Sequence, residues 1–286
     1  MHVMRARVPA SSANLGPGFD TLGLALDRYT EVTIEPADEL CGKLVGEGSQ
    51  YPLNERHLAV RIVGDILGHT RVHITINSDI PVSRGLGSSA ALSVAVAAAA
   101  GHSDPLSYAA FLEGHADNAA AAVLGGFVTA TIVDGRVYAT RLPLDPDLTF
   151  VAVVPDRHLA TVAARAALPS TVTFGDAVSN LGRMGLLISG MADGSRLVPS
   201  AGTDHLHQPF RASLFPESTV ILHGLVEAGA LTAFWSGAGP TLLGVCQRSN
   251  VRQVCDAGEE FLQQLNVPGR VYALNANTTG LELRES

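Results

Sequence analysis

The sequence predicts an α+β protein of two closely packed domains, and three observations support this prediction. Residues 1–147 mix alternating strand patterns with short, often alanine-rich helical segments. Residues 148–286 begin with the apolar run 149–154 and continue with helices separated by short strands. The stretch between the two halves, around 143–146, is a turn-rich segment and no long linker, so we expect the domains to be in contact.

The first domain, residues 1–147, has the clearer local signals. Apolar runs and alternation predict strands at 3–9, 22–35, 71–77, 127–133 and 136–142. The dipeptide Asp134-Gly135 predicts a tight hairpin between the last two. Helical patterns cover 57–67, 88–100, 105–114 and 118–124. The pair Asp104-Pro105 marks a helix start, because aspartate caps helices and proline suits the first helical position.

The second domain, residues 148–286, is expected to alternate helices with strands. Helices are expected near 159–167, 176–191, 216–229 and 249–265. Strands are expected near 149–154, 231–235, 241–246 and 270–274.

Composition and charge exclude several classes of protein. Hydrophobic residues make up 47% of the 286 residues and charged residues 16%, as in ordinary folded chains. The net charge of −8, without a basic run, argues against nucleic-acid binding. The longest apolar run, 90–100, is too short to cross a bilayer, and no secretory signal is evident. Three scattered cysteines form no disulfide framework. We expect a cytoplasmic protein without nucleic-acid or membrane partners.

The most informative segment is the glycine-rich stretch 81–90, PVSRGLGSSA. It follows the strand at 71–77 and enters an alanine-rich helix near Ser88. Free N–H groups at such a helix N-terminus suit phosphate, and Gly85 and Gly87 allow the backbone to approach a ligand closely. Serine hydroxyls there suit Mg²⁺ or a phosphate oxygen. By itself, the pattern fits a phosphate cradle and a plain strand-to-helix turn equally well.

Lysine is nearly absent, and this limits the possible chemistry. Of the 19 basic residues, only Lys43 is a lysine. The sequence therefore lacks GxxxxGK[ST], the pattern of the P-loop with its phosphate-binding lysine. Any phosphate site here must depend on backbone amides, arginine and metal.

Another glycine-containing loop, residues 9–20 (PASSANLGPGFD), carries polar side chains between two strands. Asn14 and Asp20 could bind an amine or a hydroxyl of a ligand, or could hold the loop through Asx turns. A third glycine turn, residues 234–241 (FWSGAGPT), could lie against the backbone of another loop or form a plain hairpin.

The segment 113–118, EGHADN, offers a possible metal ligand at the junction of two short helices. Glu113 could be a protein ligand of Mg²⁺ together with a serine of the glycine loop, because Mg²⁺ takes few protein ligands. Asp117, taken alone, is better explained as the N-cap of the helix at 118–124.

These loops identify a resemblance to the GHMP small-molecule kinases that covers essentially the whole chain. PxSxANLGPGFD, PxxxGLGSSA and SGAGPT stand in the family's order at 9–20, 81–90 and 236–241. Within the family the chain is most similar to the homoserine kinases, through EGHADN and the arginine segments 161–169 and 204–211. The resemblance implies the two-domain GHMP kinase fold, α+β. Its N-terminal domain would have a mixed sheet and the phosphate loop, and its C-terminal domain would be ferredoxin-like.

The resemblance also implies an activity and a set of site residues. The activity is MgATP-dependent phosphorylation of the L-homoserine hydroxyl to O-phospho-L-homoserine, in threonine biosynthesis, by an enzyme that is often a homodimer. ATP binding falls on Pro81, Arg84, Gly85, Leu86, Gly87, Ser88, Ser89, Ala90 and His57. The Mg²⁺ ligands fall on Ser89 and Glu113. Substrate binding falls on Asn14, Asp20, His115, Asn118, Arg165 and Arg211, and Asn14, Asp20 and Arg165 are the catalytic candidates.

Several interpretations stay open at this point. Without the resemblance, Arg165 and Arg211 fit solvated charges on helix faces, and the segment 204–207 resembles a weak metal cluster through Asp204, His205 and His207. Because no lysine is available to pair with Asp20, we expect alignment, helix amides and Mg²⁺ to dominate catalysis, with Asp20 orienting the substrate. A kinase for another small alcohol, mevalonate-type or sugar, and a catalytically silent nucleotide-binding protein are the alternatives.

Overall fold

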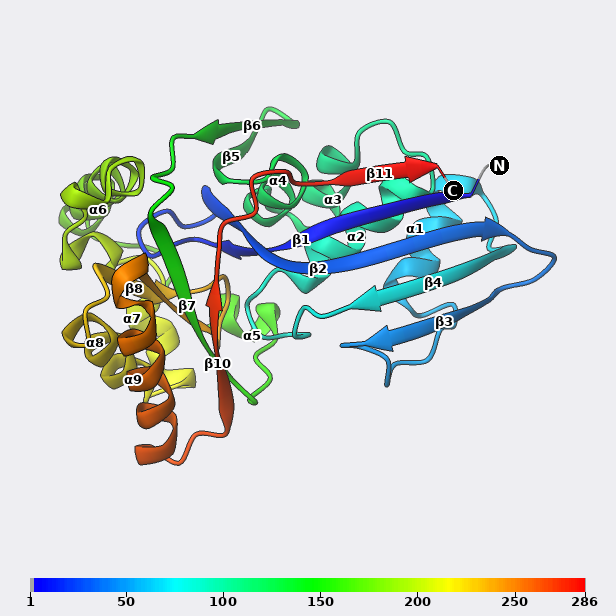
Figure 1. Ribbon diagram of the computed structural model, residues 1–286. Helices are drawn as coiled ribbons and strands as arrows, with labels where there is room; N and C mark the ends of the chain where they lie inside the picture. Colours follow the sequence, from blue (N-terminus) through cyan, green and yellow to red (C-terminus); the bar gives the residue numbers. More distant parts are fainter. Residues whose placement is uncertain (1–2, 286) are drawn as a thin grey trace.

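The computed structural model describes residues 3–285, which form two β-sheets with helices packed on each (Figure 1). The larger sheet has the order β11-β1-β2-β4-β3, and β5 pairs with both β2 and β6. Its strands are β1 (Met4–Ala13), β2 (Leu22–Pro36), β3 (Cys41–Gly46), β4 (Val72–Ser78), β5 (Phe127–Val133), β6 (Arg136–Leu142) and β11 (Glu282–Glu285). Strands β3 and β4 are parallel and the other pairs antiparallel, so the sheet is mixed as expected.

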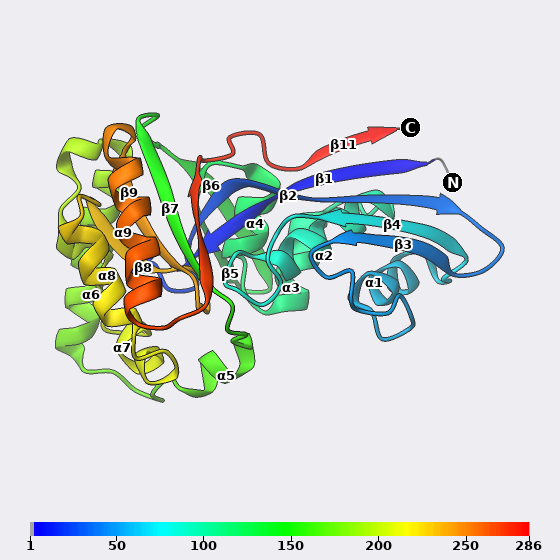
Figure 2. The same cartoon turned by 60° about the horizontal axis from the view of Figure 1, so that its bottom comes forward.

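Helices cover one face of this sheet (Figure 2). They are α1 (Leu58–Leu67), α2 (Ser88–Ala99), α3 (Pro105–Glu113) and α4 (Asp117–Leu124). Helix α2 lies at the centre, where it packs against β1, β2 and the other three helices. Its buried residues are almost all alanine or valine, because neighbours on every side leave room only for small side chains. This packing fixes the position of the N-terminus of α2.

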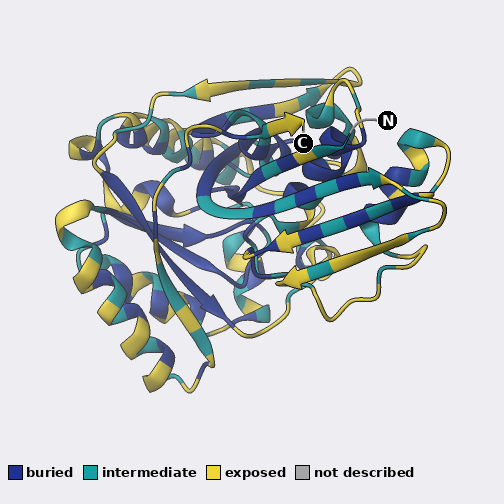
Figure 3. Cartoon of the chain, turned by 45° about the vertical axis from the view of Figure 1, so that its right-hand side comes forward, coloured by how far each residue is buried: buried dark blue, intermediate teal, exposed yellow. Residues whose placement is uncertain are grey.

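The smaller sheet has the order β10-β7-β9-β8, and all of its pairs are antiparallel. Its strands are β7 (Leu148–Pro155), β8 (Thr232–Trp235), β9 (Leu242–Gln247) and β10 (Gly269–Leu274). Helices follow its first and third strands, which gives the ferredoxin-like arrangement that the resemblance implies. They are α5 (Thr161–Ala166), α6 (Phe174–Ala192), α7 (Gln208–Arg211), α8 (Ser218–Glu227) and α9 (Val251–Gln264). Strands β7, β8 and β9 of this sheet are largely buried, whereas β10 is mostly part-buried and α9 alternates buried and exposed positions (Figure 3).

The expected elements are confirmed to within a few residues, and β3, β11 and α7 lie outside the expected ranges. Strand β1 continues to Ala13, because a register shift after Pro9 lets it keep pairing with β2. Strand β11 was not expected; residues 282–285 return from the second half of the chain and pair with β1. The domain boundary at residue 147 stays a prediction, and β11 pairs across it. Within residues 3–285, no helix is long and apolar enough to span a bilayer.

Candidate active site

The three glycine-containing loops meet at the junction of the two sheets. The end of β1, the loop before α2 and the turn between β8 and β9 are joined by backbone hydrogen bonds. These bonds run from Ser11 N to Leu86 O (3.1 Å), from Gly237 N to Ala13 O (2.9 Å) and from Thr241 N to Arg84 O (3.2 Å). The Ser236 hydroxyl adds bonds to Ser12 Oγ (2.8 Å) and Gly85 O (2.6 Å). The expected contact between the third loop and the glycine-rich loop is therefore present.

Two glycines make this close approach possible. Gly85 has a φ of 80°, and a Cβ there would lie 2.3 Å from Ser236 O. Gly87 has a φ of 65°, and a Cβ there would lie 2.1 Å from Ser11 Oγ. Both positions therefore exclude a side chain for steric and conformational reasons.

The N-terminus of α2 opens into a pocket of about 970 Å³. Its N-cap is Gly87, and within residues 3–285 no side chain caps it, so the amides of the first turn are available to a ligand. Pocket-lining positions in the loop include Gly85, Gly87, Ser88, Ser89 and Ala90. Leu86 is buried, while the side chain of Arg84 donates to Val82 O (3.2 Å) and Asp156 O (2.8 Å) and thus anchors the loop. Pro81 is also buried.

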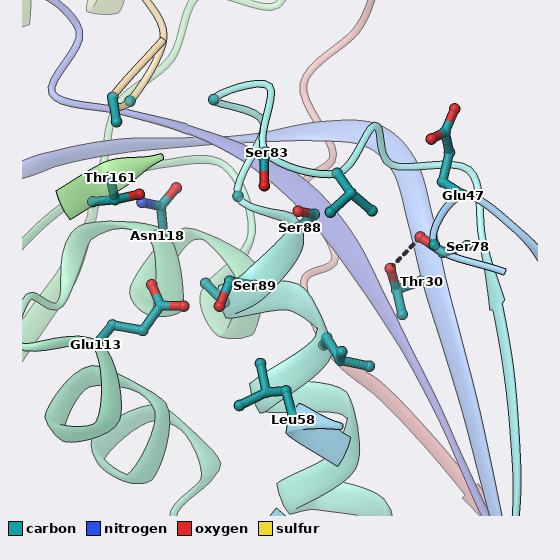
Figure 4. A pocket seen from close by; sticks show the side chains of 18 of the residues that line it. Thr30, Glu47, Leu58, Ser78, Ser83, Ser88, Ser89, Glu113, Asn118 and Thr161 are labelled. Atoms are coloured by element: carbon teal, nitrogen blue, oxygen red, sulfur yellow. Dashed lines mark hydrogen bonds between the residues drawn. The ribbon is translucent and has the colours of Figure 1, made fainter. Parts of the chain in front are cut away.

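Glu113, at the end of α3, points toward Ser89 across this pocket (Figure 4). Its side chain is 14% exposed, and its Oε1 has no hydrogen-bond partner among the described residues. Burial raises the pKa of the Glu113 carboxyl, and the nearby Ser89 hydroxyl opposes that shift. An orphaned, buried carboxylate oxygen beside a serine hydroxyl fits a magnesium site completed by water and phosphate oxygens. Within residues 3–285, no larger cluster of His, Cys, Asp and Glu suits a metal.

His115 and Asn118 lie next to Glu113, and Asp117 connects them. Asp117 Oδ1 accepts from the Asn118 N–H (2.8 Å) and lies 2.8 Å from His115 Nδ1. The N-cap expected at Asp117 is wrong: Ala116 is the N-cap, and Asp117 is a buried residue in the first turn of α4. Burial lowers the pKa of His115, but the bond to Asp117 and the surrounding carboxylates outweigh it and raise the pKa. His115 is thus biased toward its charged form.

Asp20 and Arg165 form a bidentate ion pair at the pocket wall. Arg165 Nη1 and Nη2 donate to Asp20 Oδ2 (3.0 Å) and Oδ1 (2.7 Å). Asn14 holds Asp20 in place, because its Oδ1 accepts from Asp20 N (3.0 Å) and its Nδ2 donates to Gly237 O (2.8 Å). The Asx network and the polar site considered for this loop therefore coexist. Arg165, on α5, is not a merely solvated charge.

Arg211 is also in this pocket, although it is almost fully buried. Its guanidinium donates to Gly237 O (2.9 Å) and Ala164 O (3.4 Å). Burial, followed by the positive charge of Arg165, lowers the pKa of Arg211 to about 10. The centroid of the Phe19 ring lies 5.5 Å from the Arg211 guanidinium carbon and 5.6 Å from that of Arg165. Arg165 and Arg211 thus both lie near Asp20, with Asp117 and Asp204 as further carboxylates, and their guanidinium groups suit the carboxylate of a ligand.

The metal-like cluster at 204–207 has another role. Asp204 accepts from the backbone N–H groups of Leu206, His207 and Gln208 at 2.6–3.0 Å, and so caps this turn. His205 is half-exposed and pairs with Asp176. The weak metal interpretation is wrong, because the Asp204 oxygens are satisfied by backbone donors and the two histidines bind different partners.

His57 lies at the other end of the pocket. Its Nδ1 accepts from Ala59 N (3.2 Å), so it is the N-cap of α1. Burial lowers the pKa of His57 and favours this neutral acceptor form. The surrounding wall includes Leu44, Val45 and Tyr51, and Thr30 bonds Ser78 nearby (Figure 4). This apolar end has the chemistry of a base-binding pocket.

Comparison with known proteins shows the family of this chain. Residues 55–126 match the GHMP kinases N terminal domain, and residues 177–264 match the GHMP kinases C terminal domain. The chain belongs to the GHMP kinase family. Similar proteins include the homoserine kinase of Corynebacterium urealyticum, 42% identical over 84% of this chain and 85% of that one. Another is the homoserine kinase of Caldanaerobacter subterraneus, 36% identical over 98% of this chain and 95% of that one.

Solved structures show the same fold. The homoserine kinase of Cytophaga hutchinsonii superimposes with a TM-score of 0.86 at 27% identity, covering 99% of this chain and 98% of that one. Mevalonate diphosphate decarboxylase of Staphylococcus aureus superimposes with a TM-score of 0.66 at 19% identity, over 99% and 98% of the two chains. The second likeness concerns the fold alone.

Sequence reasoning did not find the contacts that three residues make in this pocket region. The Phe19 ring lies near both arginines, Asp117 contacts both His115 and Asn118, and His207 contacts Arg211. Phe19 stands directly before Asp20 in the first motif, and Asp117 lies between two residues already singled out. His207 stands four residues before Arg211, a spacing that places both on one side of a helical turn.

Proposed function

We propose that this GHMP kinase is a homoserine kinase, which transfers phosphate from MgATP to the side-chain hydroxyl of L-homoserine. The observation that carries the proposal is the placement of Arg165, Arg211 and Asp20 in the same pocket as the open N-terminus of α2. An amino acid substrate brings a carboxylate and an ammonium group, and this set offers partners of both charges. The similarity to homoserine kinases over most of the chain supports the same activity.

The nucleotide would lie along the glycine-rich loop. The α2 amides with Ser88 and Ser89 would hold the phosphates, and the apolar end beside His57 would hold the base. Ser89 and Glu113 would be the protein ligands of Mg²⁺. When bound, Mg²⁺ neutralises charge that develops on the transferred group and its oxygens.

The substrate would bind across from this loop. Arg165 and Arg211 would bind its carboxylate, and Asp20 its ammonium group. Substrate would then insert into the Asp20–Arg165 pair, whose charges match those of a zwitterion. Asn14 would keep Asp20 in position through its hydrogen bond to the Asp20 N–H. His115 and Asn118 would position the hydroxyl-bearing side chain of the substrate.

Alignment rather than a strong base would drive the reaction. Good positioning recovers roughly 7–11 kcal/mol of a barrier, whereas general-base catalysis contributes about 10²–10⁴-fold in rate. The raised pKa of His115 favours its protonated form, which donates hydrogen bonds and cannot accept a proton. Asp20 is paired with Arg165. The lone lysine, Lys43, lies on β3 and does not line this pocket, so Asp20 has no lysine partner for base catalysis. The homodimer and the cytoplasmic location implied by the resemblance stay predictions.

A substrate panel tests this proposal. With MgATP, we expect ADP release with L-homoserine and little or none with mevalonate, galactose or shikimate, because only the amino acid offers charges that match both arginines and Asp20. A coupled ADP assay with each alcohol measures this. Turnover of another alcohol in preference to homoserine would favour the alternative small-alcohol kinase. ATP binding without turnover of any of them would favour the silent nucleotide-binding protein.

A variant at Asp20 separates substrate binding from base catalysis. We expect Asp20→Asn to raise the KM for L-homoserine about 10- to 100-fold, because a charged hydrogen-bond partner of the ammonium group is lost. Steady-state kinetics measure it. Asp134→Asn is a matched control, since Asp134 is exposed in the β5–β6 turn and has a φ of 50°, close to the 51° of Asp20. A collapse of kcat with unchanged homoserine affinity would instead indicate a general base.

A further inference from the structure

His207 is a fully buried histidine that lies behind the pocket wall rather than in it. It belongs to the turn before α7 and is 0% exposed. Its ring lies between the carbonyl of Gly16, in the first glycine-containing loop, and the guanidinium of Arg211. It therefore connects the loop that carries Asp20 to a residue of the anion site.

The hydrogen bonds of His207 define its protonation state. Nδ1 lies 3.0 Å from Arg211 Nη1, and because a guanidinium has only donors, Nδ1 must present its lone pair. Nε2 lies 2.8 Å from Gly16 O and 3.6 Å from Asp204 Oδ2, both acceptors, so the proton is on Nε2. Burial lowers the pKa of His207 to about 4, in agreement with a neutral ring. The charged groups that act on it are Asp204, Arg211 and Asp20.

Arg211 needs such an acceptor because its surroundings disfavour the positive charge of its guanidinium. It is almost fully buried, and the charge of Arg165 repels it. Its other contacts are the carbonyls of Gly237 and Ala164, on separate elements, and the Phe19 ring. His207 stacks on that same ring, with centroids 5.3 Å apart. The imidazole therefore fixes both the guanidinium and the aromatic surface beneath it.

We propose that His207 is a positioning residue that, as the neutral Nε2–H tautomer, holds Arg211 in the orientation that binds the carboxylate of the substrate. This inference rests on the proposed function and adds a residue to its substrate site. His207 acts through Arg211 and has no contact with the reacting atoms. A histidine that only fills the core would stabilise the fold without any preference among substrates.

Two amide variants each preserve a different one of the two hydrogen bonds that the ring makes. The amide of His207→Asn overlaps the Nδ1 side and can still accept from Arg211, whereas that of His207→Gln reaches the Nε2 side and favours Gly16. We expect His207→Gln to raise the KM for L-homoserine about 10- to 100-fold, as expected for loss of a charged hydrogen bond, with the KM for ATP unchanged. His207→Asn should raise the KM for L-homoserine much less. His205→Asn and His205→Gln, at the half-exposed neighbour, are the matched controls.

A substrate that lacks the carboxylate charge separates positioning from packing. With L-homoserine carboxamide, His207→Gln should show nearly the same KM as the wild type, because the charge that Arg211 recognises is absent. Equal KM changes for the acid and the amide would overturn the proposal. Thermal unfolding of each variant shows whether folding is affected, and His207→Asn remains informative if His207→Gln does not fold.

The tautomer can be measured without any substrate. Nitrogen-15 NMR of the wild type at neutral pH should show His207 protonated on Nε2 alone. A ring protonated on Nδ1, or on both nitrogens, would overturn the proposal whatever the substrate is. Failure of the wild type to phosphorylate homoserine, with the Nε2–H form present, would instead overturn the proposed function and leave the tautomer assignment intact.

Discussion

Glu113→Gln is expected to lower kcat about 1000-fold or more while leaving the protein as stable as before, or more stable. The proposed metal ligand loses its negative charge, and metal coordination contributes several kcal/mol to such transition states. Steady-state kinetics at saturating L-homoserine and varied Mg²⁺ measure the loss. The variant keeps the size of the side chain, so packing around α3 and α4 is preserved.

The stability of this variant has a defined pH dependence. Burial raises the pKa of Glu113, so the native state disfavours the carboxylate that neutral pH imposes. Below the ordinary pKa of glutamate the wild type is protonated in both states, and this effect disappears. The advantage of Glu113→Gln in free energy of unfolding should therefore grow as pH rises through the raised pKa. Denaturant unfolding in metal-free buffer at several pH values measures it.

Glu259→Gln is the control, because Glu259 is exposed on α9, in the other half of the molecule. Glu259→Gln should change neither kcat nor the pH dependence of the free energy of unfolding. An unchanged rate in Glu113→Gln would refute the metal role. A large loss of stability at neutral pH would show that the Glu113 carboxylate serves the fold instead.

Gly87→Ala is expected to abolish measurable turnover. The new Cβ would lie 2.1 Å from Ser11 Oγ and 2.9 Å from Asn118 Oδ1, and the left-handed φ of 65° adds roughly 1–2 kcal/mol of strain. To relieve the contact, the loop must move away from β1 and α4, and the amides at the N-terminus of α2 lose their alignment. ATP binding by calorimetry and the turnover assay measure the effect.

Gly68→Ala is the control for Gly87→Ala, because it introduces the same backbone strain without a steric contact. Gly68 ends α1 with a φ of 72°, and a Cβ there meets no described atom within 4 Å. This variant should lose about 1 kcal/mol of stability and retain full activity. If Gly87→Ala behaved like Gly68→Ala, the close packing of the loops would be unimportant for nucleotide binding.

Much of the fold could be predicted from local sequence. Apolar periodicity located most strands of the two sheets, and Asp134-Gly135 located the hairpin between β5 and β6. Strand β11 could not be found in this way, because residues 282–285 are short and mostly charged, and only β1 makes them a strand. Asp117 was misassigned for a related reason: an aspartate before a helix has the same local pattern whether it caps the helix or holds a neighbouring histidine.

The sequence by itself determined the glycine-rich loop, the absence of a P-loop lysine and the residue types of the anion site, because these depend on the chain's own chemistry. Only the tertiary structure decided how they work together. It joined loops from residues 9–20, 81–90 and 236–241 within hydrogen-bonding distance, and it left one oxygen of Glu113 buried without a described partner. It also placed a neutral His207 behind Arg211. Such contacts depend on the distance between residues far apart in the chain, which local sequence patterns do not encode.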